Sequence, residues 1–288
     1  MVQGEVHMKK YYVLHNPLAG HGKEKNDLEI LKSLYGEENL VRMDMTEIVD
    51  YSAYFANLSA EDEVVLSGGD GTVNHFINKT KDLNIIQNVF YLGSGSGNDF
   101  LHDIEGTCDK PVLLNPYLKN LPTVTIKGTK YKFINGVGYG IDGYCCEVGD
   151  KLRATYEKPV NYTMIAIKGL LFHYKPTDAT VIVDGKEYNF KKVWLAPTMF
   201  GKYYGGGMMP TPGQTREADQ LSVMLFHDSG KLKTLMIFPS IFSGEHVKNE
   251  KYVTMLSGKE ITVKFSEPRP LQVDGETILG VTEYTAKR

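Results

Sequence analysis

The stretch that decides the fold is Glu63-Val64-Val65-Leu66-Ser67-Gly68-Gly69-Asp70-Gly71-Thr72-Val73-Asn74. Its first four residues predict a short strand, and Val73–Lys79 is predicted to form a helix. The glycines between them let backbone N–H groups approach an anion, and the start of a helix attracts negative charge. The turn is therefore a candidate phosphate site, although an ordinary strand-to-helix turn would use similar residues.

Two further glycine-rich turns follow predicted strands. Val89–Leu92 leads into Gly93-Ser94-Gly95-Ser96-Gly97-Asn98-Asp99, and Tyr11–His15 leads into Asn16–Lys23, which contains Gly20. The carboxyl ends of parallel strands meet at one sheet edge, where open α/β sheets bind ligands. Three such turns together favour a ligand site over simple turns.

The segments around these turns alternate between strand and helix. Leu28, Leu31 and Tyr35 have helical spacing, Leu40–Met43 is a predicted strand, and Thr46 is predicted to cap a helix that carries Tyr51 and Phe55. The resulting β-α-β-α-β-α-β order predicts a doubly wound, mostly parallel α/β domain over residues 1–115.

The pattern changes after residue 115. Predicted strands recur, and Asp184-Gly185 between Thr180–Val183 and Glu187–Phe190 is a strong hairpin signal. Two helices interrupt the strands, one from about Pro159 to Tyr174 and one over Lys231–Phe238. Residues 116–288 are therefore predicted to form a mostly antiparallel β domain, with residues 280–288 as candidates to return to the first domain.

Composition excludes several classes of protein. The 288 residues include 32 Lys+Arg and 35 Asp+Glu, a net charge of −3, which argues against a dedicated nucleic-acid binder. Three cysteines without zinc spacing make neither a disulfide framework nor a zinc site and favour a reducing cytoplasm. No apolar run reaches the ~20 residues of a membrane span. Met8 is an alternative start, which leaves open whether residues 1–7 are native.

Other motifs lack the context that their chemistry needs. Gly138-Tyr139-Gly140-Ile141-Asp142-Gly143 fits the G-x-G-x-x-G spacing, but it lies in the β-rich half with no predicted β-α-β unit after it. The chain contains no Walker A sequence and no kinase H-R-D set. Neither dinucleotide binding at this motif nor a protein-kinase mechanism is predicted.

At this point the motifs resemble the catalytic domain of the diacylglycerol kinase family, which includes soluble bacterial lipid kinases and sphingosine and ceramide kinases and is more distantly related to NAD kinases. The matching segments occur in order along nearly the whole chain: Asn16-Pro17, Gly68–Asn74, Gly95–Phe100, Asn135–Asp142, Gly205–Met208 with Pro210, Gly244-Glu245-His246 and Asp274-Gly275-Glu276. The resemblance implies two domains with the active site in the cleft between them.

The resemblance also implies roles for individual residues. The nucleotide-binding positions correspond to Asn16, Gly20, Gly69, Asp70, Gly71, Thr72 and Ser96, with Thr46 matched by position rather than motif. The essential carboxylates correspond to Asp70, Asp99, Asp142 and Glu276. Glu276, expected in a turn after a strand that ends at Val273, would be the general base for the lipid hydroxyl. Without the other motifs, Asp274-Gly275-Glu276 would be an ordinary hairpin turn.

Three departures from the family pattern stand out. Ser96 replaces the usual Thr, and Leu101-His102 replaces Ala-Arg, which removes a fixed charge. Glu217-Ala218-Asp219-Gln220 replaces an Asp-Gly in the region that holds a structural Mg²⁺ in soluble bacterial members. Glu217 or Asp219 is the candidate metal ligand here, and loss of the site is the alternative.

The implied function is an ATP- and Mg²⁺-dependent lipid kinase that phosphorylates diacylglycerol or a related lipid. The alternatives are a kinase of a soluble acceptor such as NAD and a nucleotide-binding regulator without catalysis. We expect a cytoplasmic protein that is peripheral to the membrane, makes transient contact with its surface and binds no nucleic acid; a homodimer is one state that the sequence allows. Tyr139, Met164, Phe172, Met199 and Tyr204 are among the candidates for an acyl groove, with ordinary core as the alternative.

Overall fold

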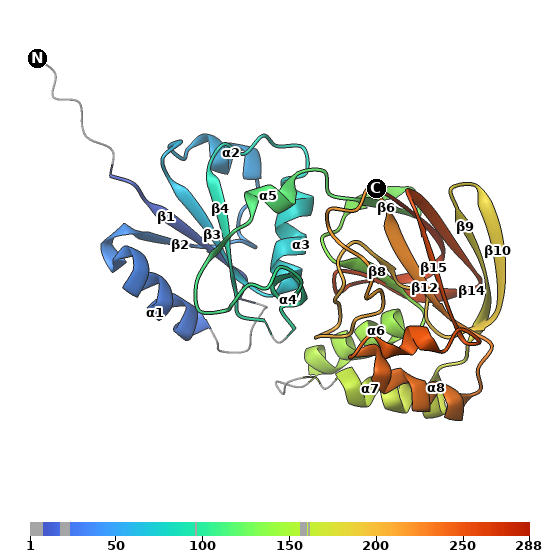
Figure 1. The fold of residues 1–288 in the computed structure, drawn as a ribbon. Helices are drawn as coiled ribbons and strands as arrows, with labels where there is room; N and C mark the ends of the chain where they lie inside the picture. Colours follow the sequence, from blue (N-terminus) through green and yellow to red (C-terminus); the bar gives the residue numbers. More distant parts are fainter. Residues whose placement is uncertain (1–7, 18–23, 96, 156–159, 161) are drawn as a thin grey trace, which may run out of the picture. The chain divides into compact units, whose positions relative to one another are not determined.

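The structure is a computed structural model that describes residues 8–17, 24–95, 97–155, 160 and 162–288 (Figure 1). The chain divides into two compact units, which are described separately. Unit 1 comprises residues 1–101 and 105–119, and unit 2 comprises residues 102–104 and 120–288. Unit 1 thus continues to Lys119, slightly past the boundary expected from the sequence.

Unit 1 is built on a five-stranded sheet in the order β2-β1-β3-β4-β5. Its strands are β1 (Tyr11–His15), β2 (Leu40–Asp44), β3 (Glu63–Gly68), β4 (Asn88–Gly93) and β5 (Val112–Leu113). The first four run parallel, and β5 is antiparallel to β4. The parallel α/β prediction is confirmed, and all four parallel strands end at the same edge of the sheet.

The helices of this part of the chain are α1 (Glu24–Tyr35), α2 (Tyr51–Ala56), α3 (Asp70–Lys79), α4 (Asp99–Asp103) and α5 (Asn115–Leu118). The buried side chains of Val13, Leu31, Val65 and Leu92 pack into one cluster, which joins α1 to the sheet. The capping prediction for Thr46 is wrong. Asp50 caps α2 instead, because its carboxylate accepts the N–H groups of Ser52 and Ala53 at 2.8 and 3.1 Å.

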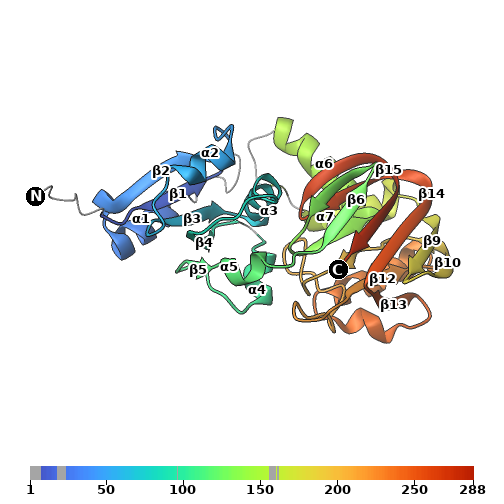
Figure 2. The same ribbon diagram turned by 90° about the horizontal axis from the view of Figure 1, so that it is seen from above.

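Unit 2 contains a ten-stranded sheet whose main order is β13-β12-β11-β8-β14-β15-β6-β7, with β9 paired to β14 and β10 to β9. Its strands are β6 (Thr123–Ile126), β7 (Thr129–Lys132), β8 (Gly136–Tyr139), β9 (Thr177–Val183), β10 (Lys186–Val193), β11 (Thr198–Met199), β12 (Leu221–Phe226), β13 (Val253–Gly258), β14 (Glu260–Val273) and β15 (Glu276–Lys287). All recorded pairs are antiparallel, as predicted. Figure 2 shows β6, β15 and β14 side by side.

The C-terminal residues do not return to unit 1. Strand β15 lies between β14 and β6, with Tyr284 opposite Ile126 and Lys287 opposite Thr123. The side chains of Val281, Tyr284 and Ala286 are buried in the core of unit 2. The expectation that residues 280–288 return to the first domain is therefore wrong. Residues 280–287 belong to β15, which lies within the sheet of unit 2 and packs its alternate apolar side chains into the core of that unit.

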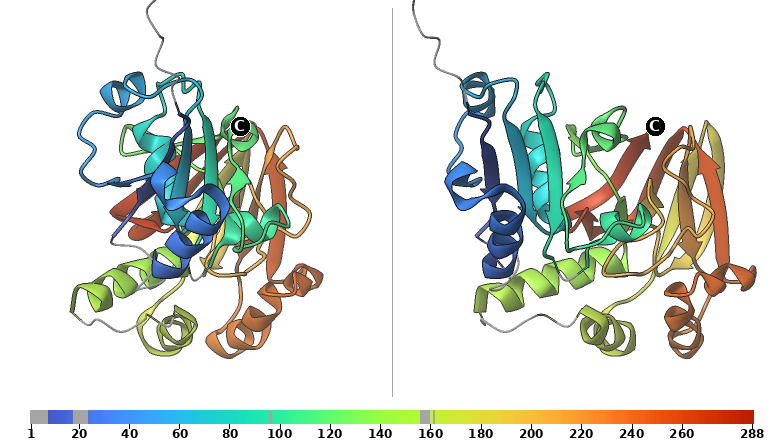
Figure 3. Two further views of the ribbon diagram at one scale, coloured as in Figure 1. Left: turned by 90° about the vertical axis from the view of Figure 1, so that its left-hand side faces the viewer. Right: turned by 60° about the vertical axis from the view of Figure 1, so that its left-hand side comes forward.

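The helices α6 (Ile141–Thr155), α7 (Tyr162–Lys168) and α8 (Lys231–Ile237) gather at one side of unit 2 (Figures 1 and 3). A π-helical turn, η2 (Gly169–His173), continues α7, and the 3₁₀ turn η3 (Phe238–Ile241) continues α8. Ile165, Leu170 and Ile237 belong to one buried cluster beneath these helices. Within the described ranges, no helix is long and apolar enough to cross a membrane.

Candidate functional site

Two of the glycine-rich turns of unit 1, those after β3 and β4, pack backbone against backbone. A Cβ added to Gly95 would lie 2.7 Å from the Cα of Gly69, closer than real Cβ atoms approach such a neighbour. The Ser94 N–H also donates to the Gly68 carbonyl at 2.8 Å. Glycine is required at Gly95 because the turn after β4 lies directly on the turn after β3. The sequence predicted that the turns converge, and the structure shows how closely.

Asp70 links these two turns through its side chain. It is the first residue of α3, and its two carboxylate oxygens accept the backbone N–H groups of Asp99 and Phe100 at 3.1 and 3.0 Å. The Asp99 side chain is buried at the same place. A carboxylate has about four lone-pair positions, so these two bonds alone do not use all of those of Asp70. Asp70 and Asp99 thus lie together at the start of two helices.

The Thr72 hydroxyl adds an unsatisfied polar atom beside Asp70. It is buried and has no hydrogen-bond partner within the described part of the chain. A Cβ added to Gly68 would lie 2.2 Å from this hydroxyl oxygen, so a side chain at position 68 would collide with it. This explains a second glycine of the motif. A buried hydroxyl without a partner costs free energy unless a ligand or water satisfies it. This atom fits a site built to receive another molecule.

The remaining nucleotide candidates lie at the same edge or outside the described residues. Asn16 directly follows β1, and Gly71 is the second residue of α3. Thr46 follows β2 and is exposed, and its hydroxyl donates to Asp44 at 2.6 Å. Gly20 and Ser96 lie outside the described residues.

Unit 2 contributes a buried carboxylate, Asp142, in the first turn of α6. One of its oxygens accepts the Tyr204 hydroxyl at 2.8 Å, and the other, Oδ2, is buried with no hydrogen-bond partner among the described residues. Burial raises the pKa of Asp142 to about 8, and the bond from Tyr204 opposes that rise. The protonation of Asp142 should therefore respond strongly to a hydrogen-bonding or cationic ligand at Oδ2.

A three-glycine loop places Tyr204 against Asp142. Gly205, Gly206 and Gly207 all have positive φ values of 62°, 85° and 99°. This conformation, which favours glycine, lets Tyr204 and Met208 exchange two backbone hydrogen bonds at 3.0 and 3.1 Å. The Gly-Gly-Gly-Met motif is thus a tight loop that positions the tyrosine hydroxyl.

The Asp-Gly-Glu motif combines a structural residue with a candidate catalytic one. Asp274 accepts the backbone N–H groups of Ile134, Asn135 and Gly136 at 2.7, 2.9 and 2.9 Å, which fixes the start of β8. Glu276 is the first residue of β15, after the two-residue turn, rather than part of the turn.

The environment of the Glu276 carboxyl suits a proton acceptor. Glu276 is exposed, yet enough protein surrounds its carboxyl to desolvate it in part, and this raises its pKa. The charge of Asp150 acts in the same direction, and Arg153 opposes it. A raised pKa makes the carboxylate a stronger base above that pKa.

A buried arginine occupies the region where the sequence suggested a metal. Arg216 forms a buried ion pair with Asp103, and its Nη atoms donate to the Ile134 carbonyl at 2.5 Å and the Asn135 side chain at 2.8 Å. Glu217 is exposed, and the exposed carboxylate of Asp219 pairs with Lys259. Among the described residues, no group of three or more His, Cys, Asp and Glu side chains could hold a metal ion. The assignment of a metal to Glu217 or Asp219 stays a prediction.

Three of the residues proposed for an acyl groove are core residues of unit 2. Tyr139 stacks on Phe265 with ring centroids 3.9 Å apart, and Met199 and Tyr204 are also buried. Met164 and Phe172 are exposed on α7 and η2 instead, so neither lines an enclosed acyl groove.

Reasoning from the sequence missed the Tyr204–Asp142 pair and Arg216. The tyrosine directly precedes three glycines, so its place beside a tight loop was visible in the chain. Its pairing with Asp142 could not be predicted, since Asp142 lies far away in the sequence. Arg216 carried no signal at all.

Two family models match the chain. The diacylglycerol kinase catalytic domain matches residues 10–121, and the YegS C-terminal NAD kinase beta sandwich-like domain matches residues 135–286. Together they cover Asp70 and Asp99 in the first match and Asp142 and Glu276 in the second.

Relatives and solved structures agree with these matches. A diacylglycerol kinase from Mycobacterium tuberculosis is 24% identical over 85% of this chain and 82% of its own length. A diacylglycerol kinase from Bacillus subtilis is 23% identical over 93% of this chain and 90% of its own. The crystal structure of a diacylglycerol kinase from Bacillus anthracis has a TM-score of 0.61 and 17% identity, and covers 99% of this chain and 96% of that chain. At that identity the structural likeness shows a shared fold.

Proposed function

This chain belongs to the diacylglycerol kinase family of enzymes, and from that premise we propose that it transfers the γ-phosphoryl group of ATP to a hydroxyl of diacylglycerol or a related lipid with the help of Mg²⁺. The observation that carries the proposal is the joining of the two glycine-rich turns by Asp70 in unit 1. Close backbone approach and the start of a helix are what a polyphosphate needs, and Thr72 supplies a hydroxyl with no hydrogen-bond partner in the described part of the chain.

The donor set of unit 1 fits a magnesium ion that arrives with the nucleotide. Such an ion keeps several waters and phosphate oxygens and needs only one or two protein carboxylates. Asp70 and Asp99, which lie together at the starts of α3 and α4, would hold it. When bound, Mg²⁺ neutralises charge on the transferring phosphoryl group.

The carboxylates of unit 2 act on the lipid hydroxyl in this proposal. Glu276 accepts the proton as the hydroxyl oxygen forms its bond to the phosphorus, and the bond from that phosphorus to the bridging oxygen of ADP breaks. Asp142 positions the acceptor through its unsatisfied oxygen, and Tyr204 holds the other oxygen in place. Burial also raises the pKa of Tyr204 well above its usual value, so the phenol remains a donor.

The test is a transfer assay with labelled ATP. Purified protein, Mg²⁺ and a total lipid extract should yield a labelled phospholipid on chromatography, and Asp70→Asn should yield none. Label on NAD or another soluble acceptor, with no labelled lipid, would contradict the lipid acceptor. Tight ATP binding with no transfer to any acceptor would instead support a nucleotide-binding regulator.

A further inference from the structure

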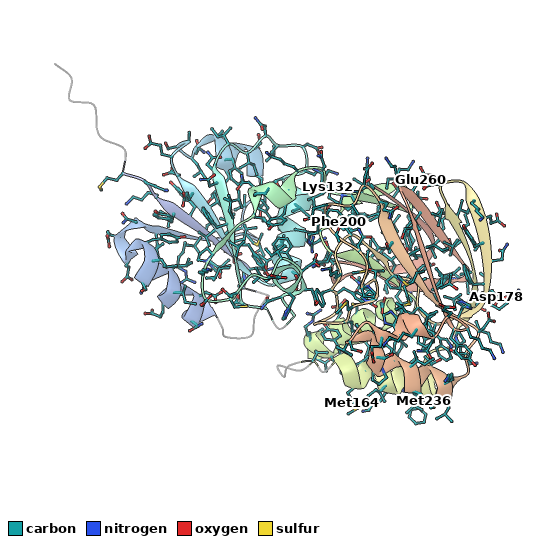
Figure 4. The ribbon with its side chains drawn as sticks, in the orientation of Figure 1. Lys132, Met164, Asp178, Phe200, Met236 and Glu260 are labelled. Atoms are coloured by element: carbon teal, nitrogen blue, oxygen red, sulfur yellow. The ribbon has the colours of Figure 1, made fainter. Side chains whose placement is uncertain are left out.

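The helical side of unit 2 carries exposed apolar side chains on elements that are adjacent in space. We define the apolar–basic face by the following residues: Met164, Phe172, Leu232, Met236 and Phe242, with Lys168, Lys175, Lys231 and Lys233. Phe172, Leu232 and Met236 are 72%, 74% and 67% exposed, high values for large apolar side chains. Figure 4 shows Met164 and Met236 on the outer side of these helices.

The two segments that form this face are joined firmly. The Lys231 ammonium group donates to the Leu171 carbonyl at 2.8 Å, which ties the start of α8 to η2. On the inner side, Leu170 and Ile237 pack into the same buried cluster. The exposed side chains therefore project from an anchored surface rather than from a loose loop.

The charge on this face has one sign. Residues 160–176 and 229–244 contain the four lysines and no Asp or Glu, although the whole chain carries 35 acidic against 32 basic residues. The nearby acidic residues already have partners: Asp228 lies 2.9 Å from His227, and Glu245 pairs with Lys248 at 2.5 Å. Glu147 and Glu267, which line a pocket with Lys175, pair with Lys151 and Arg269. Apolar side chains among unopposed lysines are typical of surfaces that insert into the headgroup region of an anionic membrane.

Charge also decides between a membrane and a second copy of the chain. A twofold dimer would place the same patch against itself. That arrangement would bring eight lysines together with no carboxylate on these segments to oppose them. An anionic lipid surface supplies the missing negative charge and an apolar layer for Phe172, Leu232 and Met236.

We propose that the apolar–basic face is the surface with which this protein docks on an anionic lipid bilayer. The inference rests on the proposed function, because a kinase of diacylglycerol must meet its acceptor at a membrane. It adds the place of contact and the class of lipid, neither of which follows from the nucleotide site.

The experiment measures sedimentation with sucrose-loaded vesicles, without nucleotide or diacylglycerol. Wild-type protein should bind vesicles of equal parts phosphatidylglycerol and phosphatidylcholine, and should bind pure phosphatidylcholine much more weakly. The triple variant Phe172→Ser, Leu232→Ser, Met236→Ser should lose at least about tenfold in binding. Lys168→Gln with Lys175→Gln should lose about fivefold per lysine and show a weaker salt dependence.

A matched control is Leu279→Ser, which removes a side chain that is 55% exposed on β15, outside the defined face. It should bind vesicles as the wild type does. Wild-type-like binding by the triple variant, or equal wild-type binding to both vesicle types, would overturn the proposal. So would a dimer in light scattering that the triple variant abolishes while vesicle binding is absent in both proteins.

Kinase activity is measured separately on a short-chain, water-dispersed diacylglycerol. Activity there by the triple variant at the wild-type rate, with vesicle binding lost, supports a docking role for the face. Vesicle binding by a wild-type protein that phosphorylates no lipid would contradict the proposed function and leave the docking surface standing. Equal phosphorylation, by the wild type and the triple variant, of diacylglycerol embedded in the anionic vesicles would do the reverse: it would support the kinase and contradict the docking surface.

Discussion

The candidate sites of the two units are built by different means. In unit 1, backbone groups form the site: Gly69 and Gly95 allow the turns to touch, and one carboxylate, Asp70, joins them. In unit 2, side chains form the candidate site. Asp142 is buried against Tyr204, and Glu276 is the first residue of β15. A backbone site suits the repeated geometry of phosphates, whereas a side-chain site can control the position of a proton. The contrast predicts that variants of the two units fail in different ways.

Loss of the base should have the largest effect on turnover. Glu276→Gln keeps the shape of the side chain but cannot accept a proton, so kcat should fall by about 10²–10⁴-fold. The affinity for ATP should change little, because the interaction is made mainly in the transition state. Steady-state kinetics with a nucleotide-binding titration checks both values. Nearly normal turnover in this variant, together with an inactive Asp142→Asn variant, would indicate that Asp142 and not Glu276 is the general base.

Loss of the buried arginine should affect stability more than chemistry. Arg216→Met leaves the buried Asp103 carboxylate without its cation, and breaking such a pair costs about 3–5 kcal/mol. Urea unfolding measures this loss. Arg153→Met is the matched control, since its pair with Asp150 is half exposed and should contribute less than about 1 kcal/mol. Adding Asp103→Asn to Arg216→Met should recover part of the loss.

Asp142 should make the stability of the protein depend on pH. Its folded pKa of about 8 lies above the ordinary value of 3.8, so its contribution to stability is fully present below pH 4 and is lost as the pH rises toward 8. Asp142→Asn removes this titration. The variant should gain a few kcal/mol relative to the wild type between pH 5 and pH 9. Urea midpoints across this range test the sign, and parallel profiles for the two proteins would contradict it.

A change in the backbone site should affect nucleotide affinity. Gly95→Ala puts a methyl group 2.7 Å from the Gly69 Cα, so the turns must separate. We expect ATP to bind at least about tenfold more weakly, or about 1.4 kcal/mol. Gly213→Ala is the control, because among the described residues no atom lies within 4 Å of its added Cβ. Equal ATP affinity in the two variants would show that the contact between the turns does not shape the nucleotide site.

The regular part of unit 1 could be predicted because local patterns specify it. Strands β1, β3 and β4 are each followed by a turn whose glycines mark the end of the strand in the sequence. Helix α6 was missed because Gly143 and Gly149 lower its helix propensity. The structure explains both glycines: an added Cβ at Gly143 would lie 1.9 Å from the Pro270 carbonyl oxygen, and one at Gly149 would lie 2.6 Å from the Tyr162 ring. Tertiary packing overrides the low helix propensity of these two glycines, and the residues next to them in the sequence give no sign of that packing.

The position of β15 has a consequence for how the chain is made. Thr123 of β6 pairs with Lys287, so an early strand of unit 2 has no neighbour on that side until residues 284–287 have been synthesised. Unit 1 draws its strands from one short stretch of chain and can fold while the ribosome is still translating unit 2. The hairpin of β6 and β7 must wait with an open edge, which exposes it to aggregation. Stalled or shortened chains should therefore contain a folded unit 1 and an unfinished sheet that attracts chaperones.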